Sequence, residues 1–111
     1  MTGWLNLIST FAIVALALAL PVPGALAQGP DARGRALLQD NCAACHAIGR
    51  TGTSPHAAAP PFRKLGASFD LEALERRLRL GIVAGHPDMP EFKFSDDDAH
   101  AVAVYLRSIQ D

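Results

Sequence analysis

Two cysteines and a histidine form the most chemically distinctive stretch of this sequence. Cys42 and Cys45 lie three positions apart, and His46 follows the second cysteine directly. Residues three apart share one side of a helical turn, so both thiols can face the edge of a flat macrocycle while the next residue approaches its metal. Proteins use this arrangement to attach haem through two thioether bonds, with the imidazole bound to iron. We therefore interpret residues 42–46 as a haem-attachment motif.

Two other chemistries use the same pair of cysteines. The pair could be a thioredoxin-like redox couple, or it could supply half of a structural zinc site. A redox couple of that kind belongs near alternating strand and helix patterns, and the sequence has no convincing run of alternating β-branched residues. A structural zinc site takes four ligands in paired clusters, whereas the remaining histidines, His56, His86 and His100, are scattered singly. Both alternatives are weaker than haem attachment.

The first 27 residues resemble a secretory signal peptide. An apolar segment over 5–20 is broken by Pro21 and Pro23, and the small residues Ala25 and Ala27 then form a cleavage signature. The segment lacks the usual Lys or Arg near its start, which leaves an uncleaved anchor as the alternative, although about 16 apolar residues fall short of the roughly 20 that a membrane helix needs. We expect cleavage before Gln28, which leaves residues 28–111 as one domain.

The charge and size of that domain limit what it can do. All ten basic and eleven acidic residues follow position 27, the formal net charge is -1 and there is no basic run, so nothing suggests a nucleic-acid partner. A chain this short has a small core for its surface, and two cysteines three apart cannot brace it globally. A porphyrin at the centre would supply the missing core, so the protein without haem should be poorly folded.

Three segments are predicted to be helices that position the motif. The first begins after Asp31, an N-cap residue, and leads through Gly34 and Leu38 into Cys42. The second spans 70–81, with an apolar stripe at helical spacing, and is capped by Asp70 and stopped by Gly81. The third begins at Ser95, with Asp98 reaching back to complete a capping box, and runs to about Ile109. The sequence therefore predicts an all-α fold.

A long loop over 47–69 separates the first two helices. Glycines and prolines interrupt any period there, and a loop of that length in a small domain is reasonable only if it wraps something, such as a haem edge. We interpret His56 in this loop as a surface residue rather than an iron ligand, and His100 as a helix-surface residue. Three cations could reach a haem propionate, although each is more simply a solvated charge: Arg50, Arg63 and Lys64. Arg76, Arg77 and Arg79 read as a solvated helix face.

Met89 stands on a stiff segment between Pro87 and Pro90, and it is the only methionine after Met1. The two prolines fix backbone angles and remove hydrogen-bond donors, which keeps Met89 out of a helix. A lone methionine more often fills a gap in a core. With a haem motif upstream, we favour an iron ligand instead.

Taken together, these features resemble the small bacterial monohaem class I cytochromes c over essentially all of 31–109. The resemblance consists of the first helix with Gly34 and Leu38, the 42–46 motif, the Pro60-Pro61 loop, the middle helix, the Met89-Pro90 loop and a closing helix with Tyr105. It implies a cytochrome c fold, with three main helices and a long loop wrapped around one covalently attached haem. In that fold Gly34 and Tyr105 would mark the crossing of the first and last helices.

The resemblance also implies the site and the function. Cys42 and Cys45 would carry the thioether links, His46 would be the proximal iron ligand and Met89 the distal one. Pro60, or Pro61 in its place, resembles the proline whose carbonyl accepts the other ring proton of the histidine. A six-coordinate iron leaves no position for substrate, so the protein would be a periplasmic one-electron carrier rather than an enzyme, a monomer that docks transiently with redox partners.

Two alternatives remain for the function. An open distal position would make a haem-based ligand or peroxide site, and the domain could instead be the haem c subunit of a larger oxidoreductase complex. The sequence departs from the best-known members in having Leu38 where they carry an aromatic residue, and in having only Lys64 and Lys93 as lysines. Docking through a ring of lysines is therefore not expected.

Overall fold

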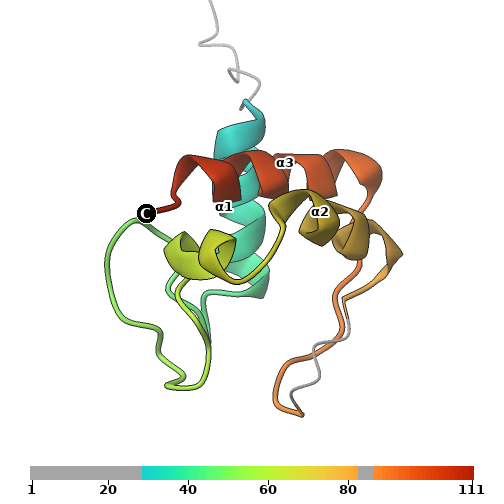
Figure 1. The fold of residues 1–111 in the computed structure, drawn as a ribbon. Coiled ribbons are helices and arrows are strands. Elements are labelled where there is room, and N and C mark those ends of the chain that lie inside the picture. Colours follow the sequence, from blue (N-terminus) through green and yellow to red (C-terminus); the bar gives the residue numbers. More distant parts are fainter. Residues whose placement is uncertain (1–28, 83–86) are drawn as a thin grey trace, which may run out of the picture.

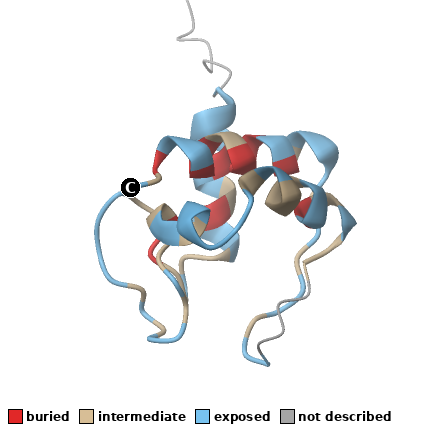
Figure 2. Ribbon diagram, viewed as in Figure 1, coloured by how far each residue is buried: buried red, intermediate tan, exposed pale blue. Residues whose placement is uncertain are grey.

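Helix α3 (Asp96–Ser108) contributes more buried residues than any other element of the described chain. The computed structural model describes residues 29–82 and 87–111. The Ser95 hydroxyl accepts a hydrogen bond from the backbone N–H of Asp98 (3.2 Å), and three acidic residues lie in the first turn, where the helix dipole favours negative charge. The inner face of α3 is apolar and buried (Figure 2): Ala99, Ala101, Val102, Ala103, Tyr105 and Leu106.

Helix α1 (Pro30–Asn41) crosses α3 (Figure 1), and Gly34 lies where the two helices meet. A Cβ atom added to Gly34 would lie 2.1 Å from the carbonyl oxygen of Ala101 and 2.9 Å from the Cβ of Tyr105. Only glycine allows the two backbones to approach so closely, which outweighs its low helix propensity. The predicted crossing of the first and last helices at Gly34 and Tyr105 is confirmed.

Two details of the predicted helix starts differ from the structure. Helix α1 begins two residues earlier than predicted, because Pro30 suits the first helical position and Gly29 takes the N-cap without a side-chain bond. Asp31 therefore lies inside the first turn, where it accepts a hydrogen bond from Ser108 (3.0 Å). Asp98 does not complete a capping box, since its carboxylate binds Arg33 of α1 instead (2.6 Å). Both acidic side chains thus tie α1 to α3 rather than cap their own helices.

Helix α2 (Leu71–Leu80) matches its predicted limits. The Asp70 carboxylate accepts hydrogen bonds from the backbone N–H groups of Glu72 (2.9 Å) and Ala73 (3.3 Å). Gly81 ends the helix with a φ of 104°, a conformation that other residues rarely adopt. Leu78 is buried in the core and α2 packs against α3 (Figure 1).

The segment between α1 and α2 is less irregular than predicted. Its last third forms a short 3-10 helix, η1 (Phe62–Ala67), where the sequence was expected to stay a loop. The physical reason is that Phe62 is buried in the core and its backbone N–H binds the carbonyl of Ala47 (2.9 Å), which fixes the start of the helix. The loop proper therefore ends at Pro61.

The described chain, 29–82 and 87–111, contains these helices and no strand, so the predicted all-α fold is confirmed. Its closest approach to a sheet is a bridge between Ile82 and Phe92, with hydrogen bonds of 2.8 and 3.4 Å. The bridge holds together the two ends of the segment that carries Met89. None of the helices in the described residues has the length and apolarity needed to cross a bilayer.

Candidate functional site

The cysteine motif forms a turn directly after α1. Cys42 caps the helix through a hydrogen bond from its N–H to the carbonyl of Leu38 (2.8 Å). The N–H groups of Cys45 (3.1 Å) and His46 (2.9 Å) then both bond to the carbonyl of Cys42. This is a helical turn in its hydrogen bonding, so the two thiols and the imidazole are fixed relative to α1.

The ring of His46 is held from two sides. Its Nδ1 atom lies 2.8 Å from the carbonyl oxygen of Pro60, and the ring packs on Phe62 with centroids 4.5 Å apart. A carbonyl can only accept a hydrogen bond, so Nδ1 must carry the ring proton and donate it. Nε2 therefore keeps its lone pair, which is the state that a metal ligand needs. Pro61, the other candidate for this contact, is the N-cap of η1.

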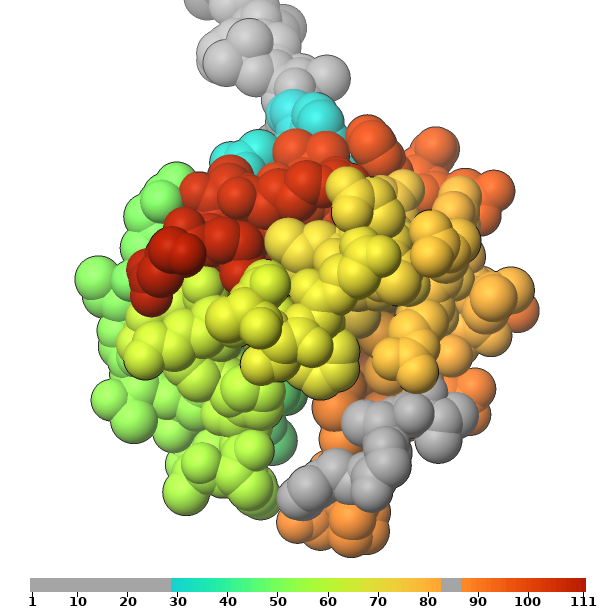
Figure 3. Space-filling view, viewed as in Figure 1, coloured from blue at the N-terminus to red at the C-terminus, as the bar shows by residue number. Residues whose placement is uncertain are grey.

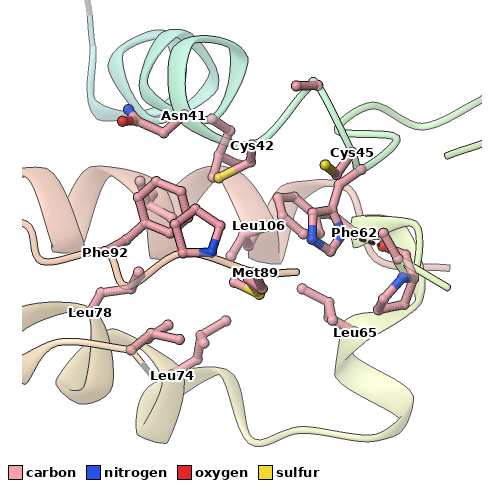
Figure 4. A pocket seen from close by; sticks show the side chains of 18 of the residues that line it. Asn41, Cys42, Cys45, Phe62, Leu65, Leu74, Leu78, Met89, Phe92 and Leu106 are labelled. Carbon is pink, nitrogen blue, oxygen red and sulfur yellow. Dashed lines mark hydrogen bonds between the residues drawn. The ribbon is translucent and has the colours of Figure 1, made fainter. Parts of the chain in front are cut away.

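An apolar cavity of about 500 Å³ lies beside the motif. Figure 4 shows Cys42 and Cys45 along one side of it, Met89 near its middle, and Leu65 and Leu74 opposite. Every helix of the described chain contributes to the wall, and the large aliphatic and aromatic side chains that line it are Leu38, Phe62, Leu65, Phe69, Leu74, Leu78, Ile82, Phe92, Phe94, Val102 and Leu106. In the space-filling view the surface is hollowed between the green segment after the motif and the orange segment near Met89 (Figure 3).

The structure brings all five sequence-predicted site residues to this cavity. Cys42, Cys45, His46, Met89 and Pro60 all line it, and all except Pro60 are partly buried. His56 also lines the cavity, contrary to the expectation of an ordinary surface position. Both of its ring nitrogens face protein groups: Nδ1 accepts the N–H of Ala58 (3.2 Å), and Nε2 lies 3.5 Å from a carboxylate oxygen of Asp88.

The other two histidines do not join the site in the described chain. His100 lies on α3, outside the cavity lining, with its Nδ1 3.4 Å from Glu75. His86 lies outside the described residues. Within 29–82 and 87–111, no three His, Cys, Asp or Glu side chains gather closely enough to hold a metal ion. The described residues therefore provide no set of ligands for a structural zinc ion.

Burial also weakens the thiol-redox alternative. Desolvation, with a smaller contribution from neighbouring Cys45, raises the pKa of the Cys42 thiol to about 11. Reactive cysteines of disulfide-exchanging proteins have lowered pKa values, because the thiolate is the nucleophile. Cys42 is therefore a protonated, weakly reactive thiol at neutral pH.

One positively charged residue that lines the cavity was not predicted from the sequence. Arg77 of α2, assigned to a solvated face, lines the cavity, and among the described lining residues it is the one Arg or Lys. The three cations considered for a propionate lie elsewhere: Arg50 donates to the carbonyl of Ser108, Arg63 to that of Gly52 (2.9 Å), and Lys64 is exposed. A signal for Arg77 was present, since it directly precedes the buried Leu78 and so borders the apolar stripe of α2.

The residues present fit a haem. The cavity is large enough for a small-molecule cofactor, for which about 300–1,000 Å³ is usual. Its lining is mostly apolar, which suits an apolar macrocycle. Thiols, an imidazole with a free Nε2 and a thioether reach the same space, which is the donor set of c-type haem attachment and ligation.

An all-α fold, a Cys-x-x-Cys-His turn and an apolar cavity beside it define a c-type cytochrome domain. The family model described as "Cytochrome C oxidase, cbb3-type, subunit III" matches residues 29–106, and the chain belongs to this family. Membership implies covalently attached haem c and a role in electron transfer. A comparison with curated proteins gave no match, and neither did a comparison with solved structures.

Proposed function

We propose that the chain is an exported one-electron carrier with one haem c, bound through Cys42 and Cys45 and ligated by His46 and Met89. One observation carries the proposal: the cysteine turn and the Met89 segment, more than 40 positions apart in the sequence, line the same apolar cavity. A thioether positioned there is a soft, neutral donor that stabilises ferrous over ferric iron, and so raises the reduction potential.

The chain's own residues have three tasks in this proposal. The carbonyl of Pro60 holds the proton on Nδ1 of His46, so that Nε2 keeps the lone pair that a metal ion would take. The bridge between Ile82 and Phe92 keeps the Met89 segment against the end of α2. The aliphatic wall excludes water, which sets the local dielectric and with it the potential. Haem itself supplies the exchangeable electron.

Location and partners follow from the sequence rather than from the described residues. We propose that residues 1–27, which lie outside the described chain, direct export to the periplasm and are cleaved before Gln28. If they were retained, they would anchor the domain to the membrane. The mature domain would be a monomer that docks weakly with redox partners around the cavity mouth, where charge affects the association rate more than the affinity.

A second candidate function is a haem c subunit of an oxidase complex, and the description of the matched family favours it. The two functions differ in what the haem protein is attached to in its native host. A free carrier would be released with the soluble periplasmic fraction. A subunit would stay with terminal-oxidase activity through detergent extraction and purification.

A third candidate is a ligand-binding or peroxide site with an open distal position. The position of Met89 in the cavity wall argues against it, because a bound methionine competes with added ligands. Rapid binding of carbon monoxide to the untreated ferrous protein would favour this candidate over the carrier.

Mass spectrometry of the protein, matured in cells that attach haem c, tests the proposal. We expect a chain that begins at Gln28 and carries the mass of one haem, which is lost when Cys42 and Cys45 are both changed to Ala. A mature chain without covalent haem would refute the proposal.

A further inference from the structure

Two loops from different parts of the chain meet at partly exposed residues of the cavity wall. Nε2 of His56 lies 3.5 Å from Oδ2 of Asp88, and both residues line the cavity. His56 belongs to the loop after the cysteine motif, and Asp88 belongs to the segment that carries Met89. Figure 1 shows the two loops, green and orange, extending from the same side of the helices.

His56 is firmly tied to the cysteine turn. Its backbone N–H donates to the carbonyl of Cys45 (3.1 Å), and its carbonyl accepts from the N–H of Ala59 (3.0 Å). The ring is fixed as well, because Nδ1 accepts the N–H of Ala58 (3.2 Å). With Nδ1 acting as an acceptor, the neutral ring carries its proton on Nε2, the atom that faces Asp88. The ring therefore presents a donor to the carboxylate without gaining a charge.

Asp88 lies next to Met89, the proposed iron ligand, on the second loop. It directly precedes Met89, and the prolines at 87 and 90 limit how the backbone between them can adjust. A displacement of the Asp88 side chain would therefore also move Met89, because the backbone between them is short and stiff. A chain of contacts along the cavity wall thus connects Cys45 through His56 and Asp88 to Met89.

We propose that His56 and Asp88 form a strap across the cavity mouth that positions Met89 and holds it at its site. The inference deepens the proposed function and rests on Met89 being the distal ligand. Neither residue would bind the cofactor: both act through the loop, as positioning residues. Because His56 and Asp88 expose 39% and 66% of their side chains, the strap belongs with surface pairs, whose contribution corresponds to about fivefold or less in an equilibrium constant.

The test measures how readily an added ligand displaces Met89 from the ferric, haem-loaded protein. Imidazole is titrated while the methionine-to-iron charge-transfer band is followed, in the wild type and in His56→Gln. We expect His56→Gln to bind imidazole about two- to fivefold more tightly, because the loop opens more easily. His100→Gln is the matched control, since it removes another exposed histidine beside a carboxylate, Glu75, away from the cavity. It should bind imidazole as the wild type does.

A double-mutant cycle shows whether the two residues act through each other. We expect Asp88→Asn to tighten imidazole binding to a similar extent, and the double variant His56→Gln/Asp88→Asn to show no further gain. Equal affinity in the wild type and His56→Gln, or additive effects in the double variant, would overturn the strap while leaving the haem ligands intact. A wild-type protein without the charge-transfer band would refute the methionine ligand itself, and the strap with it.

Discussion

Nδ1 of His46 and the carbonyl oxygen of Pro60 lie 2.8 Å apart, which fixes the tautomer of the histidine proposed to bind iron. We expect the Nδ1 proton of His46 to be observable by NMR in the haem-loaded protein and to exchange slowly with solvent. The exposed His100 serves as the comparison, and its ring N–H protons should exchange with solvent within the dead time of the NMR measurement. A His46 proton that exchanges as fast as that of His100 would show that the contact with Pro60 does not persist.

Gly34→Ala should destabilise the fold more than the small size of the added methyl group suggests. The added methyl group would meet the backbone carbonyl of Ala101 at 2.1 Å, and backbone cannot move aside as a flexible side chain can. Overpacking of this kind costs about 1–3 kcal/mol, so we expect a lower midpoint of thermal unfolding in the haem-loaded protein. Gly29→Ala is the control, because its new methyl group would meet nothing within 4 Å. Equal stability of the two variants would contradict the close crossing of α1 and α3.

The cap of α2 should weaken in acid. Hydrogen bonds lower the pKa of Asp70 below its usual 3.8. The largest effect comes from the side chain of Glu72, followed by the backbone N–H groups of Ala73 and Glu72. A lowered pKa means that the folded state prefers the ionised carboxylate, so this stabilisation is present above about pH 3.8 and is lost as the pH falls through the lower folded value.

Comparison with Asp70→Asn isolates that dependence from the other carboxylates. Asparagine caps a helix about as well as aspartate but does not titrate. In thermal unfolding of the haem-loaded proteins, we expect the wild type to lose more stability than Asp70→Asn below about pH 3.8. Parallel pH profiles would show that the Asp70 cap does not depend on its charge.

Arg77 should raise the reduction potential. Arg77 lines the cavity, where a positive charge disfavours ferric iron and suits a propionate. We expect Arg77→Gln to lower the potential by less than about 59 mV, the shift that corresponds to a tenfold change for one electron, because the exposed side chain is screened by solvent. Arg76→Gln is the matched control on the same helix, outside the cavity lining, and should leave the potential nearly unchanged. Equal shifts in the two variants would indicate only a general effect of net charge.

Local signals in the sequence were enough to predict the helices and the ligand candidates. Asp70 and Ser95 cap their helices, Gly81 ends α2, and the crossing at Gly34 follows from a glycine placed where propensity disfavours it. In each case the residue acts on backbone a few positions away, or fills a role that few other residues can fill.

The features that the sequence analysis missed all depend on distant partners. Asp98 binds Arg33 rather than its own helix, and η1 forms because Phe62 reaches the core. Arg77 was assigned to solvent because a charged residue beside an apolar stripe has the same local pattern whether or not a cavity lies next to it. The contact of His56 with Asp88 joins two loops whose sequences give no sign of each other.

Met89 is proposed to be the second protein ligand of the iron beside His46, and the near-infrared spectrum of the ferric protein tests this assignment most directly. We expect a methionine-to-iron charge-transfer band in the wild type that is absent in Met89→Ala. The same variant should have a potential more than about 59 mV lower, since the soft thioether that favours ferrous iron is gone. A wild-type protein that lacks the band, or a Met89→Ala protein that retains it, would contradict the account.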